Sequence, residues 1–372
     1  MQFSISSADL KEQLQIISGA ISSNPILPIL EDFLFKIEGD KLTISATDNQ
    51  TFMTASMHVE ADEDGSIAIP AKILLDTLRQ LPTQPLKFAV DLETFAVKVT
   101  SQFGRYSLAG EDGNDFPRLP EPDHVDQIEL PASVMLEGIN KTLFAVSQND
   151  SQVAMTGVFV QINSEGLVFV ATDAHKLVKY AFSDVETDLD GAFILPKKPL
   201  TLLKNALANS NQNVRLSYND TNAIFSFDNQ VLACRLIDEN YPNYSAVIPV
   251  DNPNTMSITR SDFLNSLKRI ANYANKTTNQ VKLDISDSSL TIEAEDLDFS
   301  NKATEQLPCF YDGEAMSIGF NAKFLIEMLN TIGGDNVRIE LSSPNRAGIL
   351  KTEEQVPSED LLMLVMPVML NV

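Results

Sequence analysis

Cysteine is scarce in this chain of 372 residues, and signals for export are lacking. Cys234 and Cys309 are its only cysteines, too few for a disulfide-stapled secreted scaffold. No apolar run reaches the roughly 18 residues that a transmembrane helix needs. The first residues, MQFSISSADLKEQ, lack the basic region and apolar stretch of a secretory signal. The sequence therefore predicts a reduced, cytoplasmic protein with no membrane partner.

Catalytic signals are lacking too. The three histidines, His58, His124 and His175, are isolated from one another, and no zinc-binding or phosphate-binding motif is present. Asp173 and His175 suggest an acid–base pair, but no nucleophile motif accompanies them. The acidic runs at 62–64 and 111–112 are typical of turns on an acidic face rather than of a cation site. We therefore expect a protein that is not an enzyme and that holds no metal and no cofactor.

Positive charge is in short supply. The chain has 27 lysines and arginines against 51 acidic residues, which gives a net charge of −24. Such a balance favours solubility and, taken alone, argues against binding to nucleic acid.

The chain does contain internal repeats, which are the first feature to seek in a sequence of this length. The segments LTISATD, LVFVATD and LTIEAED end at Asp48, Asp173 and Asp296. A second motif recurs around Lys72, Lys198 and Lys323, and a third around Pro117 and Pro242. These motifs share spacings of 123 to 126 residues and keep the same order. The repeats predict three similar domains, at 1–122, 123–250 and 251–372.

Each repeat has two similar halves. A helical pattern over 7–21 puts Leu10, Leu14, Ile17 and Ile21 on one apolar stripe, and alternating apolar strands follow it. A helix over 71–81 and three more strands repeat the order. The predicted fold class is therefore α+β, with each domain built from a duplicated unit of helix and antiparallel sheet.

The charge is distributed unevenly between these elements. The predicted helices, at 7–21, 71–81, 131–147, 197–209, 259–276 and 322–332, contain twelve basic and six acidic residues. The rest of the chain contains 15 basic and 45 acidic residues. Solvation alone would explain the lysines of a single helix. Six helices on one surface, however, would attract phosphates weakly, as a protein that slides along DNA requires.

Four segments of the chain resemble a known family. They are NPILPILEDFLF at 24–35, ATDAHKL at 171–177, RLIDENYPNYSAVIP at 235–249 and VMP at 365–367. The whole chain resembles the bacterial beta sliding clamps, the processivity subunit of the replicative DNA polymerase III holoenzyme. The resemblance implies the DNA clamp fold. Each subunit would form half of a closed ring, a head-to-tail homodimer with helices inside and sheets outside.

The resemblance also implies partners. They are double-stranded DNA encircled without sequence preference, the replicative DNA polymerase, the clamp loader, and repair polymerases and other proteins with clamp-binding motifs. By resemblance, their peptides would bind a pocket of Met155, Thr172, His175, Leu177, Pro242, Val247, Leu364, Val365, Met366, Pro367 and Val368. The same residues could instead be ordinary core. The family often ends in Met-Pro-Met-Arg-Leu, whereas this chain has Met369 in place of the arginine and two added residues.

Two further sets of residues follow from the resemblance. The residues that would face DNA are Asn24, Lys72, Arg79, Asn149, Lys197, Lys198 and Lys204. Some family members have arginine in place of Asn24 and glutamine in place of Asn149. The residues of the subunit interface would be Tyr106 and Leu108 on an edge strand, opposite Asn272 and Tyr273.

Two other functions stay open at this point. The first is a hydrolase or another enzyme built on repeated domains, which would need clustered polar residues that break the repeat symmetry. The second is an acidic, repeat-built scaffold protein that does not bind nucleic acid. The basic bias of the helices speaks against the scaffold.

Overall fold

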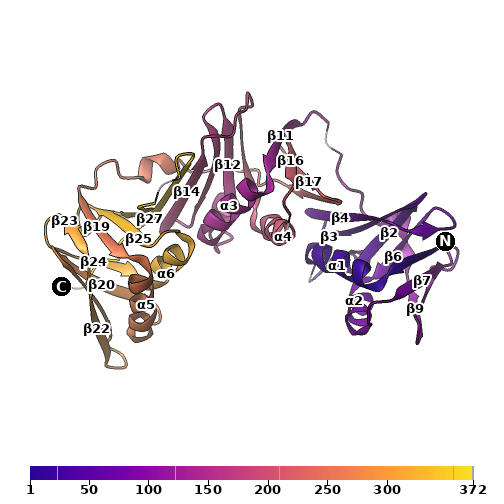
Figure 1. Ribbon diagram of the computed structural model, residues 1–372, viewed down its shortest axis with the longest axis horizontal. Coiled ribbons are helices and arrows are strands. Elements are labelled where there is room, and N and C mark those ends of the chain that lie inside the picture. The colour runs from indigo at the N-terminus through magenta and orange to yellow at the C-terminus, as the bar shows by residue number, and fades with distance from the viewer. Residues whose placement is uncertain (23, 122, 209, 355, 371–372) are drawn as a thin grey trace. The chain divides into compact units, whose positions relative to one another are not determined.

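The computed structural model describes residues 1–22, 24–121, 123–208, 210–354 and 356–370. The chain forms two compact units, Met1–Leu136 with Leu195–Leu236, and Glu137–Ile194 with Ile237–Val372. Each unit consists of antiparallel sheets with helices packed against them (Figure 1), so the predicted α+β class is confirmed. None of the described helices is long and apolar enough to cross a membrane.

The first unit contains two sheets. The five-stranded sheet has the order β5 (Glu60–Ala61), β1 (Gln2–Ser6), β7 (Pro85–Val90), β8 (Ala96–Thr100), β9 (Arg105–Ala109). The nine-stranded sheet has the order β10 (Glu111–Asp112), β6 (Gly65–Pro70), β2 (Asp32–Glu38), β3 (Lys41–Thr47), β4 (Thr51–His58), β18 (Gln230–Arg235), β17 (Asn222–Phe227), β16 (Asn213–Tyr218), β11 (Asp126–Pro131).

The second unit also contains two sheets. Its nine-stranded sheet has the order β15 (Gly191–Pro196), β12 (Gly157–Asn163), β13 (Gly166–Thr172), β14 (Lys176–Phe182), β27 (Glu359–Val365), β26 (Gly348–Thr352), β25 (Asn336–Leu341), β19 (Asn254–Thr259), β23 (Phe310–Asp312). Its four-stranded sheet has the order β22 (Asn301–Pro308), β21 (Ser289–Asp296), β20 (Gln280–Ser286), β24 (Met316–Asn321).

Six α-helices lie in the described part of the chain. They are α1 (Ser7–Ile17), α2 (Ala71–Gln80), α3 (Ala132–Thr142), α4 (Lys197–Leu207), α5 (Arg260–Ile270) and α6 (Ala322–Thr331). Within the units, α1 packs against α2 and α5 packs against α6 (Figure 1). Leu10, Leu14 and Ile17 are fully buried, as the predicted apolar stripe requires.

Three of the predicted helices end earlier than expected. Short 3-10 turns follow them directly, namely η1 (Ser18–Ala20), η4 (Leu143–Ala145) and η7 (Ala271–Tyr273). An apolar stripe does not distinguish an α-helix from a 3-10 turn at its end, where such turns are common. At Gly19 a Cβ atom would lie 2.3 Å from Leu202 Cδ2, so this turn brings its backbone tightly against α4. Asn209, the last residue of the predicted helix 197–209, lies outside the described residues.

Two antiparallel strand pairs connect neighbouring repeats. In the first junction, β4 of the first repeat pairs with β18 of the second, with Met53 opposite Leu232. In the second junction, β14 of the second repeat pairs with β27 of the third, with Val178 opposite Met363. Because sheets continue across the repeats, the compact units do not coincide with the three predicted domains.

Candidate functional site

A cavity of about 580 Å³ lies beside the second junction. Seven of the eleven residues predicted to form the peptide pocket line it: Met155, Thr172, Leu177, Pro242, Val247, Leu364 and Met366. Val247 and Met366 are 55% and 40% exposed, so they are not ordinary core residues. Exposed apolar side chains around a hollow are typical of an interaction site.

The other four predicted residues lie outside the lining. Val365 is fully buried within β27. His175 is exposed, and its ring stacks on Phe324 at a centroid distance of 6.3 Å. Pro367 is half-buried, and the Val368 amide donates a hydrogen bond to the Gly319 carbonyl at 2.8 Å. All four were placed in the pocket by the family resemblance, without a local signal of their own.

The loop at the cavity floor is held by its own side chains. The Thr172 hydroxyl donates to the Lys176 carbonyl at 2.7 Å, and Asp173 Oδ1 accepts from the His175 and Lys176 amides, each at 2.9 Å. This is an Asx turn, in which a carboxylate replaces a backbone acceptor. It explains why Asp173 follows a strand without taking part in catalysis. Between these residues, Ala174 adopts a left-handed conformation with a φ of 73°.

A buried lysine under the cavity was not predicted. Lys176 Nζ lies 3.0 Å from Asp173 Oδ2 and 3.0 Å from Glu327 Oε2, with its side chain only 7% exposed. It also lies 4.4 Å from the ring centroid of Phe324. The sequence around Lys176 does not distinguish it from basic residues on other strands. The residues that surround its ammonium group, Glu327 and Phe324, come from a helix that is distant in the sequence.

Several further lining residues were missed as well. They are Ala174, Asn243, Tyr244, Ala246, Ile248, Pro249, Asn345, Arg346 and Ala347. Most belong to η6 (Tyr244–Val247) and its flanks, inside the segment YPNYSAVIP that the family resemblance singled out. Asn345, Arg346 and Ala347 come from the β25–β26 turn, where no repeated motif marks the sequence.

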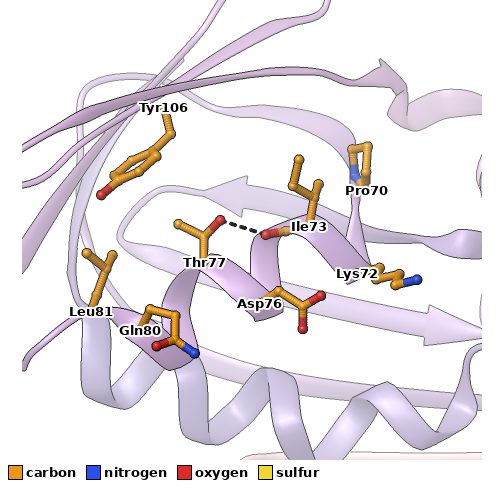
Figure 2. A pocket seen from close by; sticks show the side chains of 8 residues that line it. All are labelled: Pro70, Lys72, Ile73, Asp76, Thr77, Gln80, Leu81 and Tyr106. Carbon is orange, nitrogen blue, oxygen red and sulfur yellow. Dashed lines mark hydrogen bonds between the residues drawn. The ribbon is translucent and has the colours of Figure 1, made fainter.

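A second cavity, of about 720 Å³, lies in the first unit between α2 and β9. Figure 2 shows Tyr106 across from the α2 face that carries Ile73 and Thr77, whose hydroxyl donates to the Ile73 carbonyl at 2.7 Å. Ile73 is 52% exposed, and Leu81 lines the cavity just beyond the end of α2. The predicted interface residue Tyr106 therefore lines an open apolar hollow.

Two of the edge strands in the described sheets bear on the predicted subunit interface. β9, with Tyr106 and Leu108, is the last strand of its sheet, and β22 is the last strand of another. Unpaired edges carry free N–H and C=O groups that favour pairing with another strand. The predicted residues Asn272 and Tyr273 are exposed on η7, which contacts β22.

The predicted DNA-facing residues differ in how free they are. Asn24, Lys72, Asn149, Lys197 and Lys204 are exposed and have no ion pair with a described residue. Arg79 pairs with Asp76 at 2.9 Å. Lys198 Nζ donates to the Ala20 and Ile21 carbonyls and to Asp48 Oδ2, at 3.0, 3.3 and 2.6 Å. An ammonium has three donors, so Lys198 is fully engaged within the first unit.

Reactive groups are not gathered anywhere in the described chain. No group of three or more potential metal ligands occurs among the described residues. Both cysteines are free, and burial raises the pKa of Cys234 to about 12, which disfavours the nucleophilic thiolate. In the first unit, burial raises the pKa of Asp32 to about 7, with smaller contributions from Glu111 and Glu31.

Family models match the chain along nearly its whole length. The N-terminal domain of the DNA polymerase III beta subunit matches residues 1–120, the central domain 129–243 and the C-terminal domain 245–368. Curated relatives named "Beta sliding clamp" are 30% identical in Synechocystis sp., over 98% of both chains, and 29% identical in Vibrio cholerae, over 100% of both.

Solved structures match the whole fold. The crystal structure of the DNA polymerase sliding clamp from Bacillus subtilis has a TM-score of 0.94 at 24% identity, over 100% of both chains. The sliding clamp from Pseudomonas aeruginosa bound to griselimycin has a TM-score of 0.93 at 25% identity, again over 100% of both chains.

Proposed function

The chain belongs to the DNA polymerase III beta subunit family, the beta sliding clamps. From this premise we propose which of its surfaces contact DNA, a second copy of the chain and partner proteins. It is a non-catalytic processivity factor. It encircles duplex DNA without sequence preference and tethers the replicative polymerase, the clamp loader and repair polymerases. The match of all three family domains in order, across the whole chain, carries this conclusion. The reaction belongs to the partners, and the bacterial cytoplasm is the compartment that fits these activities.

The repeats support three domains, at 1–122, 123–250 and 251–372, and the first two end near proline-rich or acidic stretches. Pro122 and Val372, at two of these bounds, lie outside the described residues. An acidic scaffold that ignores DNA gains no support from the matched families.

The chain closes into a dimer by repeating its internal junctions. The three repeats have equivalent residues on the strand that faces a junction. In β4 this residue is Met53, paired with Ala46, and in β14 it is Val178, paired with Ala171. In β22 it is Ala303, paired with Ala294. On the strands that pair with these across a junction, the equivalent residues are Leu232 in β18, Met363 in β27 and Tyr106 in β9. A third junction, between β22 of one copy and β9 of the other, would set Ala303 opposite Tyr106. The smallest side chain would then face the largest, which conserves volume.

Helix contacts at the third junction follow the same template. In the first junction, η1 packs on α4, with Leu202 against Gly19. The equivalent pair is η7 and α2, so Tyr273 of one copy would enter the hollow beneath Tyr106 of the other. Lys72 occupies in α2 the place of Lys198 in α4, and it is available to η7 of the partner copy as well as to DNA.

The register has a direct test. Cys309→Ser removes the one half-exposed thiol, and Ala303→Cys with Tyr106→Cys then places two thiols at facing positions. Mild oxidation should give a covalent dimer. Lys302→Cys with Tyr106→Cys points the thiols to opposite faces and should not cross-link. A protein that sediments only as monomer at micromolar concentration would overturn the dimer itself.

DNA contact rests on a weakly basic set of helices. The six α-helices contain eleven basic and six acidic residues, a net of +5, while the chain carries −24. Arg260, Arg269 and Lys141 are already used by carbonyls or by Glu305. Few lysines therefore remain for phosphate, which favours loose enclosure over tight groove binding.

The test of enclosure is topological. Protein placed by a clamp loader on nicked circular DNA should stay bound and should leave when the circle is linearised. Equal retention on both forms would rule out enclosure. Lys197→Ala with Lys204→Ala should weaken direct binding to DNA at low salt, and the difference from the wild type should shrink as salt rises, because fewer phosphates are neutralised.

The cavity beside the second junction binds the short linear peptides of the partners. A leucine and an aromatic side chain docked there would each gain about 1.5–3 kcal/mol before ordering costs, which favours micromolar, exchangeable binding. Truncation before Leu364, or Met366→Ala with His175→Ala, should abolish binding of a polymerase-derived peptide while the dimer survives.

A further inference from the structure

One aspartate recurs at the end of the same strand in all three repeats, and in two of them it binds a lysine. In the first repeat, the Lys198 ammonium lies 2.6 Å from Asp48 Oδ2, and Asp48 Oδ1 accepts from the Thr51 amide at 2.7 Å. In the second, the Lys176 ammonium lies 3.0 Å from Asp173 Oδ2, while Oδ1 accepts from two turn amides. One carboxylate oxygen therefore holds the turn, and the other receives a cation.

The third of these aspartates, Asp296, has the turn bond but no cation. Its Oδ1 accepts from the Asp298 amide at 3.1 Å and from the Asn275 side-chain amide at 3.5 Å. It forms no ion pair with any described residue, although it is only 3% exposed and Asp48 and Asp173 are less deeply buried. Burial of a carboxylate without a cation costs free energy. One copy of the chain therefore leaves this position electrostatically incomplete.

The lysines that lie near Asp296 in the sequence are used elsewhere. Asn301 is the first residue of β22, whereas Lys176 is the first residue of β14, so the cation of the second repeat has no counterpart here. Lys302 pairs with two glutamates of β21. The Lys276 ammonium donates to a backbone carbonyl at 3.2 Å. Among the described residues, Asp296 therefore has no lysine or arginine of its own.

The first junction indicates where such a cation comes from. Lys198 is the second residue of α4 in the second repeat, and it crosses the junction to Asp48 and to two carbonyls at the end of η1. In the third junction, α2 of a second copy takes the place of α4, and its second residue is Lys72. The turns η1 and η7 end alike, with the closing amide 3.2 and 3.4 Å from the carbonyl three residues earlier. Lys72 is exposed and has no ion pair with a described residue, so it is available to a second copy.

From this pattern we infer that Lys72 of one copy forms an ion pair with Asp296 of the other, at both third junctions of the ring. The inference rests on the proposed dimer. Closure of the ring gives the buried carboxylate its cation, and it withdraws Lys72 from the lysines available to phosphate. The pair also selects the partner surface, because Asp296 stays uncompensated beside any strand edge that does not bring a lysine with it.

The test exchanges the two charges between copies. Lys72→Glu and Asp296→Lys each set like charges against one another at both junctions of a homodimer, so the dissociation constant of each variant should rise about a hundredfold or more. In an equimolar mixture of the two variants, one junction joins the two exchanged charges and the other joins the two native ones. The mixture should therefore form a heterodimer with an affinity close to that of the wild type. Sedimentation velocity over a dilution series, with one variant fluorescently labelled, measures all three dissociation constants.

Lys323→Glu is the matched control, because Lys323 is the second residue of α6, is exposed and has no ion pair with a described residue. It should change the dissociation constant by less than about twofold. Recovery on mixing also shows that both exchanged variants fold, since unfolded chains would not regain a partner.

Two results would overturn the inference: variant homodimers as stable as the wild type, or a mixture no more stable than its components. A Lys72→Met protein that dimerises normally but binds duplex DNA more weakly would overturn it too, because Lys72 would then be a DNA contact. If the wild type itself does not dimerise, the proposed ring fails, and the inference fails with it.

Discussion

The first and second junctions share a backbone but not a surface. The Arg235 amide donates to the Gln50 carbonyl at 2.9 Å in the first, and the Met366 amide donates to the His175 carbonyl at 2.8 Å in the second. The strand registers also agree. The side chains at the ends of β18 and β27 differ, because Arg235 in the first junction is replaced by Met366 in the second. The same local fold therefore carries a structural junction in one place and the proposed peptide-binding surface in the other.

The largest effect should come from exchanging these two side chains. Met366→Arg places an uncompensated guanidinium where a peptide's apolar anchor has to dock, and burial of an unpaired charge is costly. Peptide affinity should fall by about a hundredfold or more, close to 3 kcal/mol. Isothermal titration with a polymerase-derived peptide measures it. Arg235→Met is the reciprocal control and should leave affinity unchanged. A Met366→Arg protein with normal affinity would refute the site.

A second difference lies at the start of β2 and of its counterpart, β12. Asp32 is buried at the position that Gly157 holds in the second repeat, and its pKa is raised from 3.8 to about 7. The folded state therefore keeps a proton that the unfolded state loses, and stability falls as pH rises from about 4 to about 7. Asp32→Asn should stabilise the protein at both pH values, by about 2–3 kcal/mol more at pH 8 than at pH 5.

Thermal unfolding of the wild type and of Asp32→Asn at the two pH values measures this. Gly157→Asn is the control at the equivalent position. It removes no buried carboxyl, so it should give no stabilisation that grows with pH. A stabilisation by Asp32→Asn that is equal at pH 5 and pH 8 would show that Asp32 titrates as an ordinary carboxyl.

A third comparison concerns lysines at one repeat position. Lys198 bonds Asp48 and two carbonyls, whereas Lys323 is exposed and has no ion pair with a described residue. Lys198→Ala should lower the free energy of unfolding by about 1–2 kcal/mol, because it leaves Asp48 and the carbonyls of η1 unpaired. Lys323→Ala should change it by less than about 0.5 kcal/mol. Equal losses in denaturant titrations would remove the distinction.

The smallest effect concerns the turn between β13 and β14. Asn49 and Ala174 hold equivalent places with φ values of 71° and 73°, and alanine tolerates this conformation less well than asparagine. Ala174→Asn should stabilise the protein by about 0.5–1 kcal/mol, and Asn49→Ala should destabilise it by a similar amount. Differential scanning calorimetry of the two variants should give shifts of opposite sign. A shift of the same sign would point to contacts rather than backbone strain.

Much of the fold was accessible from the sequence because its signals are local. The period of the helix at 71–81 predicted α2 (Ala71–Gln80) closely, and turn residues predicted the strand ends. The pairing of β4 with β18 was not accessible, since Thr51 and Cys234 are far apart and no local pattern links them. Burial of Lys176 escaped for the same reason, because Glu327 compensates it from another helix.

The residues of the candidate site were predictable where they lie in a segment that is repeated in the chain or that resembles the clamp family. Thr172, Leu177 and Pro242 lie in such segments, and they line the cavity. Arg346 lies in an ordinary turn, and only the strand pairing brings that turn to the cavity rim. Val365 was placed in the pocket by resemblance and does not line the cavity, because alternate side chains of a strand point to opposite faces.

The shared register of the junctions also bears on modularity. Every repeat has one edge strand at one end and a complementary edge strand at the other. A chain of such repeats could therefore contain any number of them. Removing the middle repeat would still leave β9 at one end and β22 at the other, with their edge chemistry intact. How many chains a closed assembly takes would then depend on the number of repeats it needs, and gene duplication or fusion could redistribute those repeats among chains without redesigning a single contact.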